Sequence, residues 1–277
     1  MRINRASHKQ EEGTHFRSSR LLEVTDFALS FTTYTGGLKE TTEQAIKKLD
    51  MTIDTGEIVA VVGASGSGKS LLANAILGML PANATVSGLI KYKGKALTLQ
   101  DQVQLRGTEI AMIPQSVNSL DPLMKAGKQV RTMIKGKNKK EKQREIFAAV
   151  GLDEKVERNY PFQLSGGMAR RVLIAIAMVS SAELIVADEP TPGLDEQALE
   201  DSIRPIRLLA DQGKGVMFIT HDIGTALRLA DKIVVFNDGK TIETANVKDF
   251  YGKGEALRHP YTKQLWNALP QNGFHTP

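Results

Sequence analysis

A glycine-rich loop between an apolar strand pattern and an apolar helix pattern constrains this chain more than any other feature. The residues before the loop, Ile58–Val62, are all apolar and predict a buried strand, and residues 71–77 predict a helix. The loop consists of Gly63, Ala64, Ser65, Gly66, Ser67, Gly68, Lys69 and Ser70. A simple turn is the alternative interpretation, but this spacing between a strand and a helix is typical of a loop that binds phosphate.

Each residue type in this phosphate loop has a chemical reason to be there. Glycines let successive backbone N–H groups surround a phosphate, and the N-terminus of the following helix adds partial positive charge. The ammonium of Lys69 can reach the β- and γ-phosphates, and the hydroxyl of Ser70 can bind Mg²⁺. We therefore predict a nucleotide site over residues 63–71, with Leu71 as its last member.

Length and composition limit what this loop can serve. The chain has 277 residues, of which 41% are hydrophobic, enough for one large α/β unit with a substantial core. No apolar run approaches the roughly 18–20 residues that span a bilayer, and the N-terminus has no apolar signal core. We expect a cytosolic chain. It has no cysteine, which excludes disulfides, thiolate metal sites and iron–sulfur clusters.

The positive charge of the chain is concentrated in two segments. The net charge is +5, yet residues 125–145 contain nine Lys or Arg and two Glu, and residues 1–20 contain five Lys or Arg and two Glu. The densest part, residues 135–142, has no aromatic residue with which to stack a base. We interpret it as a solvated run and expect no nucleic-acid partner. Residues 1–20 are expected to form a basic flexible tail.

The remaining strands follow from apolar runs and turn residues. Residues 21–31 and 45–53 predict strands, with a turn near residues 34–37, and residues 86–99 predict a further short β segment. Residues 109–114 predict a strand that carries Gln115 at its end, where polar groups in α/β sheets reach a ligand. Residues 126–182 predict mostly helix. Residues 196–209 predict another helix, which Pro205 should kink or interrupt.

Two more buried strands end in polar residues. Residues 184–187 are followed by Asp188 and Glu189, and beside a phosphate loop such a pair can bind Mg²⁺ and activate water. An ordinary surface pair is the alternative. The strand Gly215–Thr220 is followed by His221, and a lone His after a strand is more often structural than functional. A hairpin is expected over residues 232–243, because Asp238 and Gly239 suit its turn.

These strands alternate with helices and therefore predict a mostly parallel α/β sheet of the P-loop NTPase, RecA-like class. One further segment, Ser165, Gly166 and Gly167, stands immediately before an expected helix, with Ser165 as its N-cap. It can be a second anion-binding helix end, used in a head-to-tail dimer on the phosphates held by the partner. A Gly-Gly turn that only marks the helix start is the other interpretation.

The ordered set of these motifs resembles the ATP-binding subunit of ABC transporters over residues 21–270, the rest being a C-terminal tail. The set comprises the phosphate loop, Gln115, residues 164–168, Asp188 with Glu189, Asp195 and His221. The resemblance implies an ATPase that uses ATP and Mg²⁺, with Glu189 as catalytic base, His221 at the γ-phosphate, and Gln115 and Asp188 at the metal. It also implies an antiparallel β subdomain and an inserted helical subdomain, at about residues 120–182. Asp195 would face the dimer interface.

In the same family an aromatic residue near the N-terminus stacks on adenine. Phe31 and Tyr34 both lie in the corresponding region, and we favour Phe31. Two positions depart from the usual pattern, because Arg170 stands where Gln is common and Pro192-Gly193 replaces Ser-Ala.

A narrower resemblance points to the peptide and nickel importer branch. It rests on residues 115–124, 159–163 and 259–265, and Met168, in place of the usual Gln, is similar to the nickel and metallophore members. The branch implies a second, different ATPase subunit, two transmembrane permease subunits and an extracytoplasmic binding protein, with this chain at the cytoplasmic face of the membrane. Residues 116–124 should then form the groove for a permease helix. Peptide, nickel and metal–metallophore cargo stay open, as does an ATPase subunit of a soluble complex that does not transport.

Overall fold

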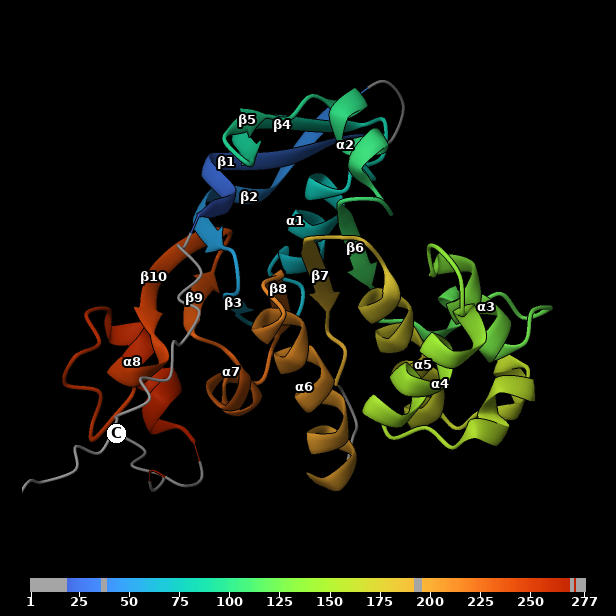
Figure 1. The fold of residues 1–277 in the computed structure, drawn as a ribbon. Helices are drawn as coiled ribbons and strands as arrows, with labels where there is room; N and C mark the ends of the chain where they lie inside the picture. Colours follow the sequence, from blue (N-terminus) through green and yellow to red (C-terminus); the bar gives the residue numbers. More distant parts are fainter. Residues whose placement is uncertain (1–18, 36–38, 192–195, 270–271, 273–277) are drawn as a thin grey trace, which may run out of the picture.

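The computed structural model describes residues 19–35, 39–191, 196–269 and 272 (Figure 1). One mixed sheet runs through the molecule with the strand order β5-β4-β1-β2-β10-β9-β3-β8-β7-β6. The strands are β1 (Arg20–Thr35), β2 (Lys39–Asp54), β3 (Ile58–Val62), β4 (Ala84–Tyr92), β5 (Lys95–Ala96), β6 (Ile110–Ile113), β7 (Leu184–Asp188), β8 (Gly215–Thr220), β9 (Lys232–Asn237) and β10 (Lys240–Asn246).

The helices are α1 (Lys69–Ile76), α2 (Leu99–Leu105), α3 (Ala126–Met133), α4 (Lys139–Ala149), α5 (Gly166–Val179), α6 (Glu196–Asp211), α7 (Ile223–Leu229) and α8 (Pro260–Asn267). Short 3₁₀ helices are η1 (Val117–Ser119), η2 (Glu154–Arg158), η3 (Pro161–Gln163) and η4 (Val247–Asp249). The expected strands and helices are all present. Helix α6 continues through Pro205, so of the predicted kink or break the break does not occur.

The centre of the sheet is parallel and buried on both faces. Strands β9, β3, β8, β7 and β6 pair in parallel, and every residue of β3, β7 and β8 is buried. Side chains of β3 alternate: Val59 and Val61 pack in the cluster that contains α1, whereas Ile58, Ala60 and Val62 pack in the cluster that contains α5, α6 and α7. A continuous apolar run is therefore required, because both faces are covered.

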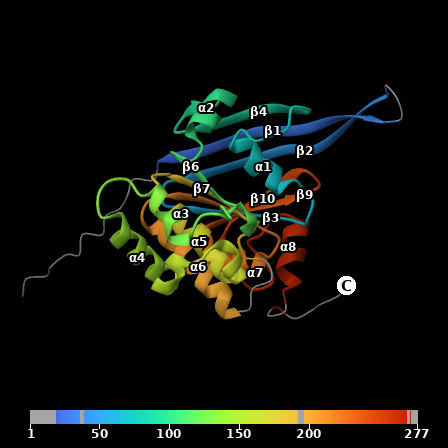
Figure 2. The same ribbon diagram turned by 90° about the vertical axis from the view of Figure 1, so that its right-hand side faces the viewer.

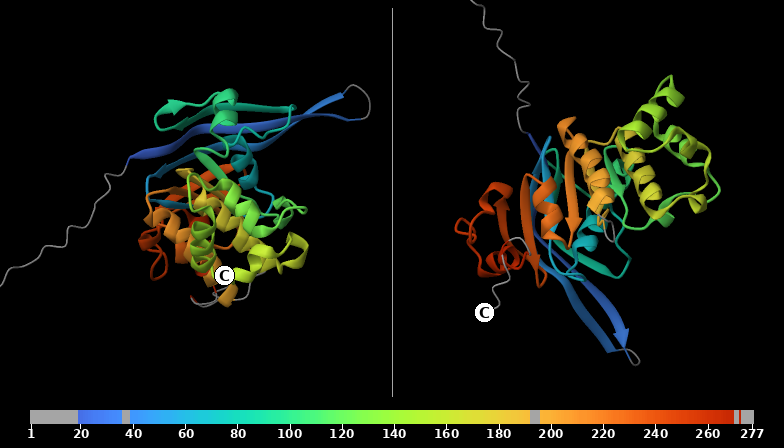
Figure 3. Two further views of the ribbon diagram at one scale, coloured as in Figure 1. Left: turned by 45° about the vertical axis from the view of Figure 1, so that its right-hand side comes forward. Right: turned by 90° about the horizontal axis from the view of Figure 1, so that it is seen from below.

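Strands β1, β2, β4 and β5 form an antiparallel layer that lies over α1 (Figure 2). Lys93, in the turn between β4 and β5, ties this layer to the parallel sheet through ion pairs of 2.9 Å with Glu109 and 2.8 Å with Glu183. The N-terminal hairpin of β1 and β2 extends beyond the rest of the molecule (Figure 3).

Helices α3, α4 and α5 form a lobe at the side of the sheet (Figure 1). Phe147 fills its apolar interior with 1% exposure. Polar contacts join α3 to α4 and η2. Arg131 of α3 donates to the buried side chain of Gln143 in α4 over 2.6 Å and lies 3.5 Å from Glu157 in η2. The lobe occupies the place in the chain where the inserted helical subdomain is expected.

Candidate active site

The phosphate loop connects β3 to α1, as the sequence predicts. Gly63 cannot carry a side chain, because a Cβ there would lie 2.1 Å from the carbonyl oxygen of Phe236 in β9. Gly68 has a φ of 100°, in the region that glycine tolerates best, and its carbonyl oxygen accepts the N–H of Leu72. The close packing on β9 and the left-handed turn fix the loop against the end of the parallel sheet.

This loop opens into a pocket of about 320 Å³. The pocket is lined by Ser65, Gly66, Gly68, Lys69, Ser70, Leu71, Gln115 and Glu189. Residues predicted from three separate stretches of sequence thus meet at one place. They meet although they are far apart in the sequence, because β3, β7 and β6 all end at the same edge of the parallel sheet, with β8 between β3 and β7.

The ammonium of Lys69 lies on the loop itself. Its Nζ donates to the carbonyl oxygens of Gly63 and Ala64 over 2.9 and 2.8 Å, and lies 3.4 Å from Oγ of Ser67. Burial lowers the pKa of Lys69, and the nearby carboxylates of Glu189 and Asp188 oppose that shift. The amine is therefore poorly solvated and is held by carbonyl groups. Because little water competes for it, it would bind an added phosphate strongly.

Ser70 and Asp188 form the oxygen-rich part of the site. The Ser70 hydroxyl donates to Oδ1 of Asp188 over 2.9 Å. Burial raises the pKa of Asp188 most, the bond from Ser70 lowers it, and the negative charge of Glu189 raises it further. A hydroxyl and a carboxylate fit Mg²⁺, which prefers oxygen ligands. No three His, Cys, Asp or Glu side chains gather as a metal cage in the described part of the chain, so phosphate and water would complete the coordination.

Glu189 lies between the two other polar residues predicted for catalysis. Its carboxylate accepts from Nε2 of Gln115 over 3.2 Å and lies 3.4 Å from Nδ1 of His221. Its backbone has a φ of 42°, unusual for a residue with a side chain, and its N–H is held by the carbonyl of Ile219 over 3.0 Å. The chain thus changes direction directly after the buried Asp188. The carboxylate of Asp188 contacts Ser70, whereas Glu189 lies in the pocket wall.

The Ser-Gly-Gly segment lies apart from this pocket. Ser165 caps α5, since its hydroxyl accepts the N–H of Met168 over 3.2 Å, which confirms its predicted role as N-cap. Neither Ser165 nor Gly166 nor Gly167 is among the described residues that line the pocket at the phosphate loop. A Cβ at either glycine would meet no atom of the described residues within 4 Å, so among these residues the helix end is uncovered.

The two aromatic candidates for stacking on adenine differ in their exposure. Phe31 is partly buried against the apolar cluster under β1, whereas the side chain of Tyr34 is 69% exposed. Asp195 lies outside the described residues.

Sequence reasoning missed Asp222, which follows His221 directly. Its carboxylate accepts the N–H groups of Gly224 and Thr225 over 2.9 and 3.2 Å and so fixes the start of α7. An Asp followed by apolar residues at helical spacing was the available signal.

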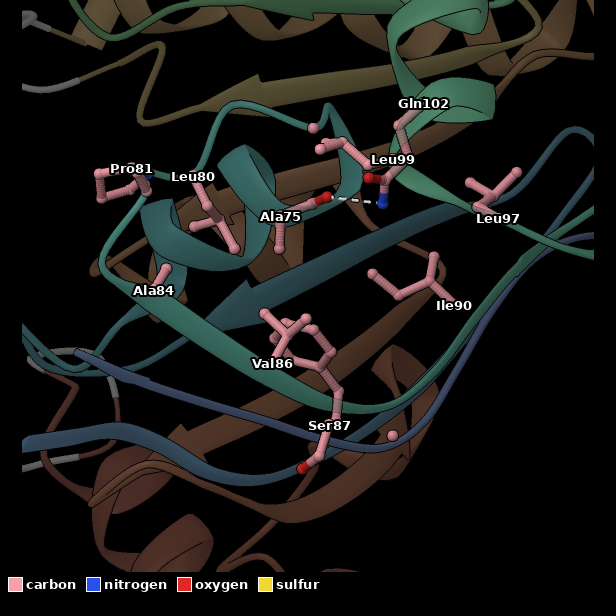
Figure 4. Close-up of a pocket in the computed structure, with 14 residues that line it drawn as sticks. Ala75, Leu80, Pro81, Ala84, Val86, Ser87, Ile90, Leu97, Leu99 and Gln102 are labelled. Atoms are coloured by element: carbon pink, nitrogen blue, oxygen red, sulfur yellow. Dashed lines mark hydrogen bonds between the residues drawn. The ribbon is translucent and has the colours of Figure 1, made fainter. Parts of the chain in front are cut away.

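A second hollow of about 360 Å³ lies between α1, β4 and α2 (Figure 4). Its walls are mainly apolar, with Leu80, Val86, Ile90 and Leu99 facing it, and the Gln102 amide is engaged by the carbonyl of Ala75 over 2.8 Å. It contains none of the predicted catalytic residues. The polar pocket at the phosphate loop is therefore the candidate active site.

Comparison with known proteins identifies the family of this chain. The family model described as "ABC transporter" matches residues 46–192. The oligopeptide transport ATP-binding protein OppD of Bacillus subtilis is 37% identical over 92% of this chain and 73% of its own length. The dipeptide transport ATP-binding protein DppD of Lactococcus lactis is 34% identical over 91% of this chain and 74% of its own length.

Solved structures show the same fold. A dimeric ATP-binding cassette in a post-hydrolysis state, bound to ADP and Pi, is similar with a TM-score of 0.69 and 27% identity, over 82% of this chain and 99% of that one. The P-loop NTPase fold expected from the sequence is confirmed. No helix in the described ranges is both long and apolar enough to cross a bilayer. This chain belongs to the ABC transporter family and is one of its ATP-binding subunits, an ATPase.

Proposed function

We propose that this chain powers an ABC importer for peptides or for nickel and metal–metallophore complexes, as one of two ATPase subunits. The observation that carries the proposal is the division of the site. The phosphate pocket and the Ser-Gly-Gly helix end are both present, but they lie on separate surfaces of one chain. The relatives are named for oligopeptide and dipeptide transport, which favours peptides as cargo.

Within the pocket, the residues take distinct roles in the proposal. Backbone N–H groups of residues 63–71 and the Lys69 ammonium bind the phosphates of ATP. Ser70, Asp188 and Gln115 would hold Mg²⁺, which would supply positive charge to neutralise the phosphates. Phe31 stacks on the adenine ring.

Glu189 is the proposed general base. Its side chain is 14% exposed, and it stands at the pocket wall between Gln115 and His221. From there it can accept a proton from the water that attacks the γ-phosphate, while His221 contacts that phosphate. Transfer of the phosphoryl group to water releases ADP and phosphate.

The second ATPase subunit completes the site. A head-to-tail dimer would bring the N-terminus of its α5-equivalent helix to the γ-phosphate bound here, and Ser165 with Gly166 and Gly167 would serve the partner in return. Asp195 would contribute to communication between the subunits. Dimeric cassettes of the same fold support this arrangement.

Exposed large apolar side chains in the helical lobe suit a permease. Leu123 is 87% exposed and Phe162 is 76% exposed, and the ring of Phe162 stacks on Tyr160 with centroids 5.6 Å apart. Exposed large apolar side chains of this kind mark protein interaction sites. We infer that one of the two permease subunits of the system docks here. The chain would then lie at the cytoplasmic face of the membrane, and an extracytoplasmic binding protein would be part of the same system.

Co-purification from membranes tests this function. A tagged chain should be recovered with hydrophobic membrane proteins and with a second ATPase, and Leu123→Asp should reduce that recovery while leaving ATP binding unchanged. Val103→Asp is the matched control, since Val103 is also an exposed apolar residue but lies on α2. Recovery in a stable soluble complex without membrane proteins would instead identify a non-transport ATPase subunit.

A further inference from the structure

The helical lobe carries a small pocket that the ATPase reaction does not use. It lies where the C-terminal ends of α3 and α5 meet α4, and its volume is about 310 Å³. It is lined by Ile134, Lys135, Lys142, Glu145, Ile146, Val179 and Ser181. Figure 2 shows α4 at the periphery of the molecule, and Lys135, Lys142, Glu145 and Ser181 of the pocket are exposed.

The floor of the pocket is apolar. Ile134 is 4% exposed, and Ile146 and Val179 are partly buried against the main apolar cluster. Lys142, Glu145 and Ile146 are spaced three and four residues apart on α4 and thus share one helix face. Hydrocarbon and charged groups consequently lie next to one another.

The rim of the pocket is cationic. Nζ of Lys135 donates to Oγ of Ser181 over 3.0 Å, and that hydroxyl donates to the carbonyl of Thr108 over 3.0 Å. The Ser181 hydroxyl thus holds one ammonium at the mouth of the pocket, and Lys142 supplies a second. Glu145 is the single acidic residue among those that line it.

The surface around the pocket carries further positive charges. Lys137, Lys139 and Lys140 are exposed. No ion pair joins a described carboxylate to any of these three lysines, or to Lys135 or Lys142. Arg144, also on α4, is paired with Glu154. An excess of exposed ammonium groups next to hydrocarbon calls for a ligand that joins an anion to an apolar chain.

We propose that this pocket, the α4 pocket, binds the headgroup and upper acyl methylenes of an anionic phospholipid. Its size admits a headgroup and a few methylene groups but not two complete acyl chains, so the lipid would stay in the bilayer. A nucleic acid fits less well, because no aromatic residue lines the pocket on which a base could stack. Each lysine near an anionic leaflet contributes to the electrostatic free energy of binding, and the contributions of several lysines add up.

The inference rests on the proposed function only in placing this chain at a membrane. It adds a direct lipid contact to the contact with the permease, on a different part of the lobe. Two weak attachments together hold a peripheral protein on a bilayer far better than either one alone.

Vesicle co-sedimentation of the purified full chain tests the proposal. We expect binding to phosphatidylcholine vesicles that contain phosphatidylglycerol and none to pure phosphatidylcholine. Lys135→Ala with Lys142→Ala should weaken binding about thirtyfold, from the loss of two lysines at the anionic surface. The control pair, Lys137→Ala with Lys140→Ala, removes the same charge outside the pocket and should have a clearly smaller effect.

A neutral variant separates a pocket from diffuse attraction. Ile146→Ser leaves every charge in place but removes part of the apolar floor, so it should weaken vesicle binding severalfold, while Val103→Ser on α2 should not. Equal losses in the two lysine pairs, or no loss with Ile146→Ser, would overturn the proposal.

Competition and activity measurements complete the test. Glycerol phosphate, which has the anion without the hydrocarbon, should compete weakly; competition as strong as that of vesicles would mean a free anion ligand and overturn the proposal. Tighter binding of a single-stranded oligonucleotide than of vesicles would also overturn it. Basal ATPase activity should be unchanged in all of these variants. Co-purification with permeases is a separate readout, so failure of the importer assignment would be distinguishable from failure of lipid binding.

Discussion

The hydroxyl of Ser70 lies 2.9 Å from a carboxylate oxygen of Asp188, although the two residues are 118 positions apart in the chain. Ser70 lies in the first turn of α1 and Asp188 ends β7, so the fold brings a hydroxyl and a carboxylate to one point. Both groups are acceptable Mg²⁺ ligands, and burial keeps the pKa of Asp188 above its usual value. The buried carboxylate of Asp188 that suits Mg²⁺ therefore also lowers the stability of the folded chain when no cation is bound.

Asp188→Asn should therefore separate stability from activity. The amide keeps an oxygen for the Ser70 hydroxyl but removes a poorly solvated negative charge, so we expect a higher melting temperature without Mg²⁺ and nucleotide. Mg²⁺-dependent hydrolysis should fall by orders of magnitude. Thermal unfolding and phosphate release measure the two effects.

The pH dependence of that stabilisation gives a further check. A folded-state pKa above the unfolded value means that the buried carboxylate destabilises the fold at high pH, and that protonation relieves the cost as pH falls. The gain from Asp188→Asn should accordingly be present at neutral pH and shrink below the raised pKa of Asp188. An advantage that grew on acidification would contradict the assigned direction.

Glu189→Gln should reduce hydrolysis by about two to four orders of magnitude, the usual contribution of a general base, with ATP affinity preserved. The change keeps the side-chain volume and one oxygen for Gln115, so the pocket wall should stay in place. Steady-state turnover and nucleotide titration measure the two quantities. Glu141→Gln on exposed α4 is the matched control. Near-normal turnover of Glu189→Gln would show that another group activates the water.

Lys69→Ala should act on binding rather than on the chemical step alone. The variant removes the only ammonium in the described pocket wall, so ATP affinity should fall at least tenfold, as expected for the loss of a charge-assisted bond. ADP and ATP titrations by fluorescence or calorimetry measure the loss. The double variant Lys137→Ala with Lys140→Ala provides a control for a general change in charge, and unchanged affinity in Lys69→Ala would refute the proposed phosphate contact.

Much of the fold follows from local pattern in the sequence. The strands β3, β7 and β8 are continuous apolar runs, and the turn at Asp238 and Gly239 has φ values of 47° and 72°, as the hairpin prediction requires. Gln115, Asp188, Glu189 and His221 were located because each follows a predicted strand. Pro205 is the exception: its fixed φ is compatible with a helix, and the packing of Ile203, Ile206 and Leu209 in the core outweighs the lost hydrogen bond.

Other features depend on contacts that no local pattern reveals. The sequence does not indicate that the carbonyl of Phe236 excludes a side chain at Gly63, because those residues are brought together only by the pairing of β3 with β9. The left-handed φ of Glu189 is likewise invisible in an Asp-Glu pair. The α4 pocket lies where the C-terminal ends of α3 and α5 meet α4, so it can be recognised only when the packing of these helices is known.

Phe31 and Tyr34 provide the sharpest remaining test of the nucleotide site. Phe31 is partly buried beside the sheet, and Tyr34 is 69% exposed near the end of β1. Stacking of a base on an aromatic ring contributes about 1–3 kcal/mol, so loss of the correct ring should weaken ATP binding about fivefold to a hundredfold. Phe31→Leu keeps apolar bulk in the core and removes only the flat ring, and Tyr34→Leu is its match. We expect Phe31→Leu to lower affinity for ATP while affinity for inorganic triphosphate, which lacks a base, is unchanged. If Tyr34→Leu gives that pattern and Phe31→Leu does not, the adenine-stacking residue is Tyr34 and the exposed end of the hairpin must bend toward the phosphate loop when ATP binds.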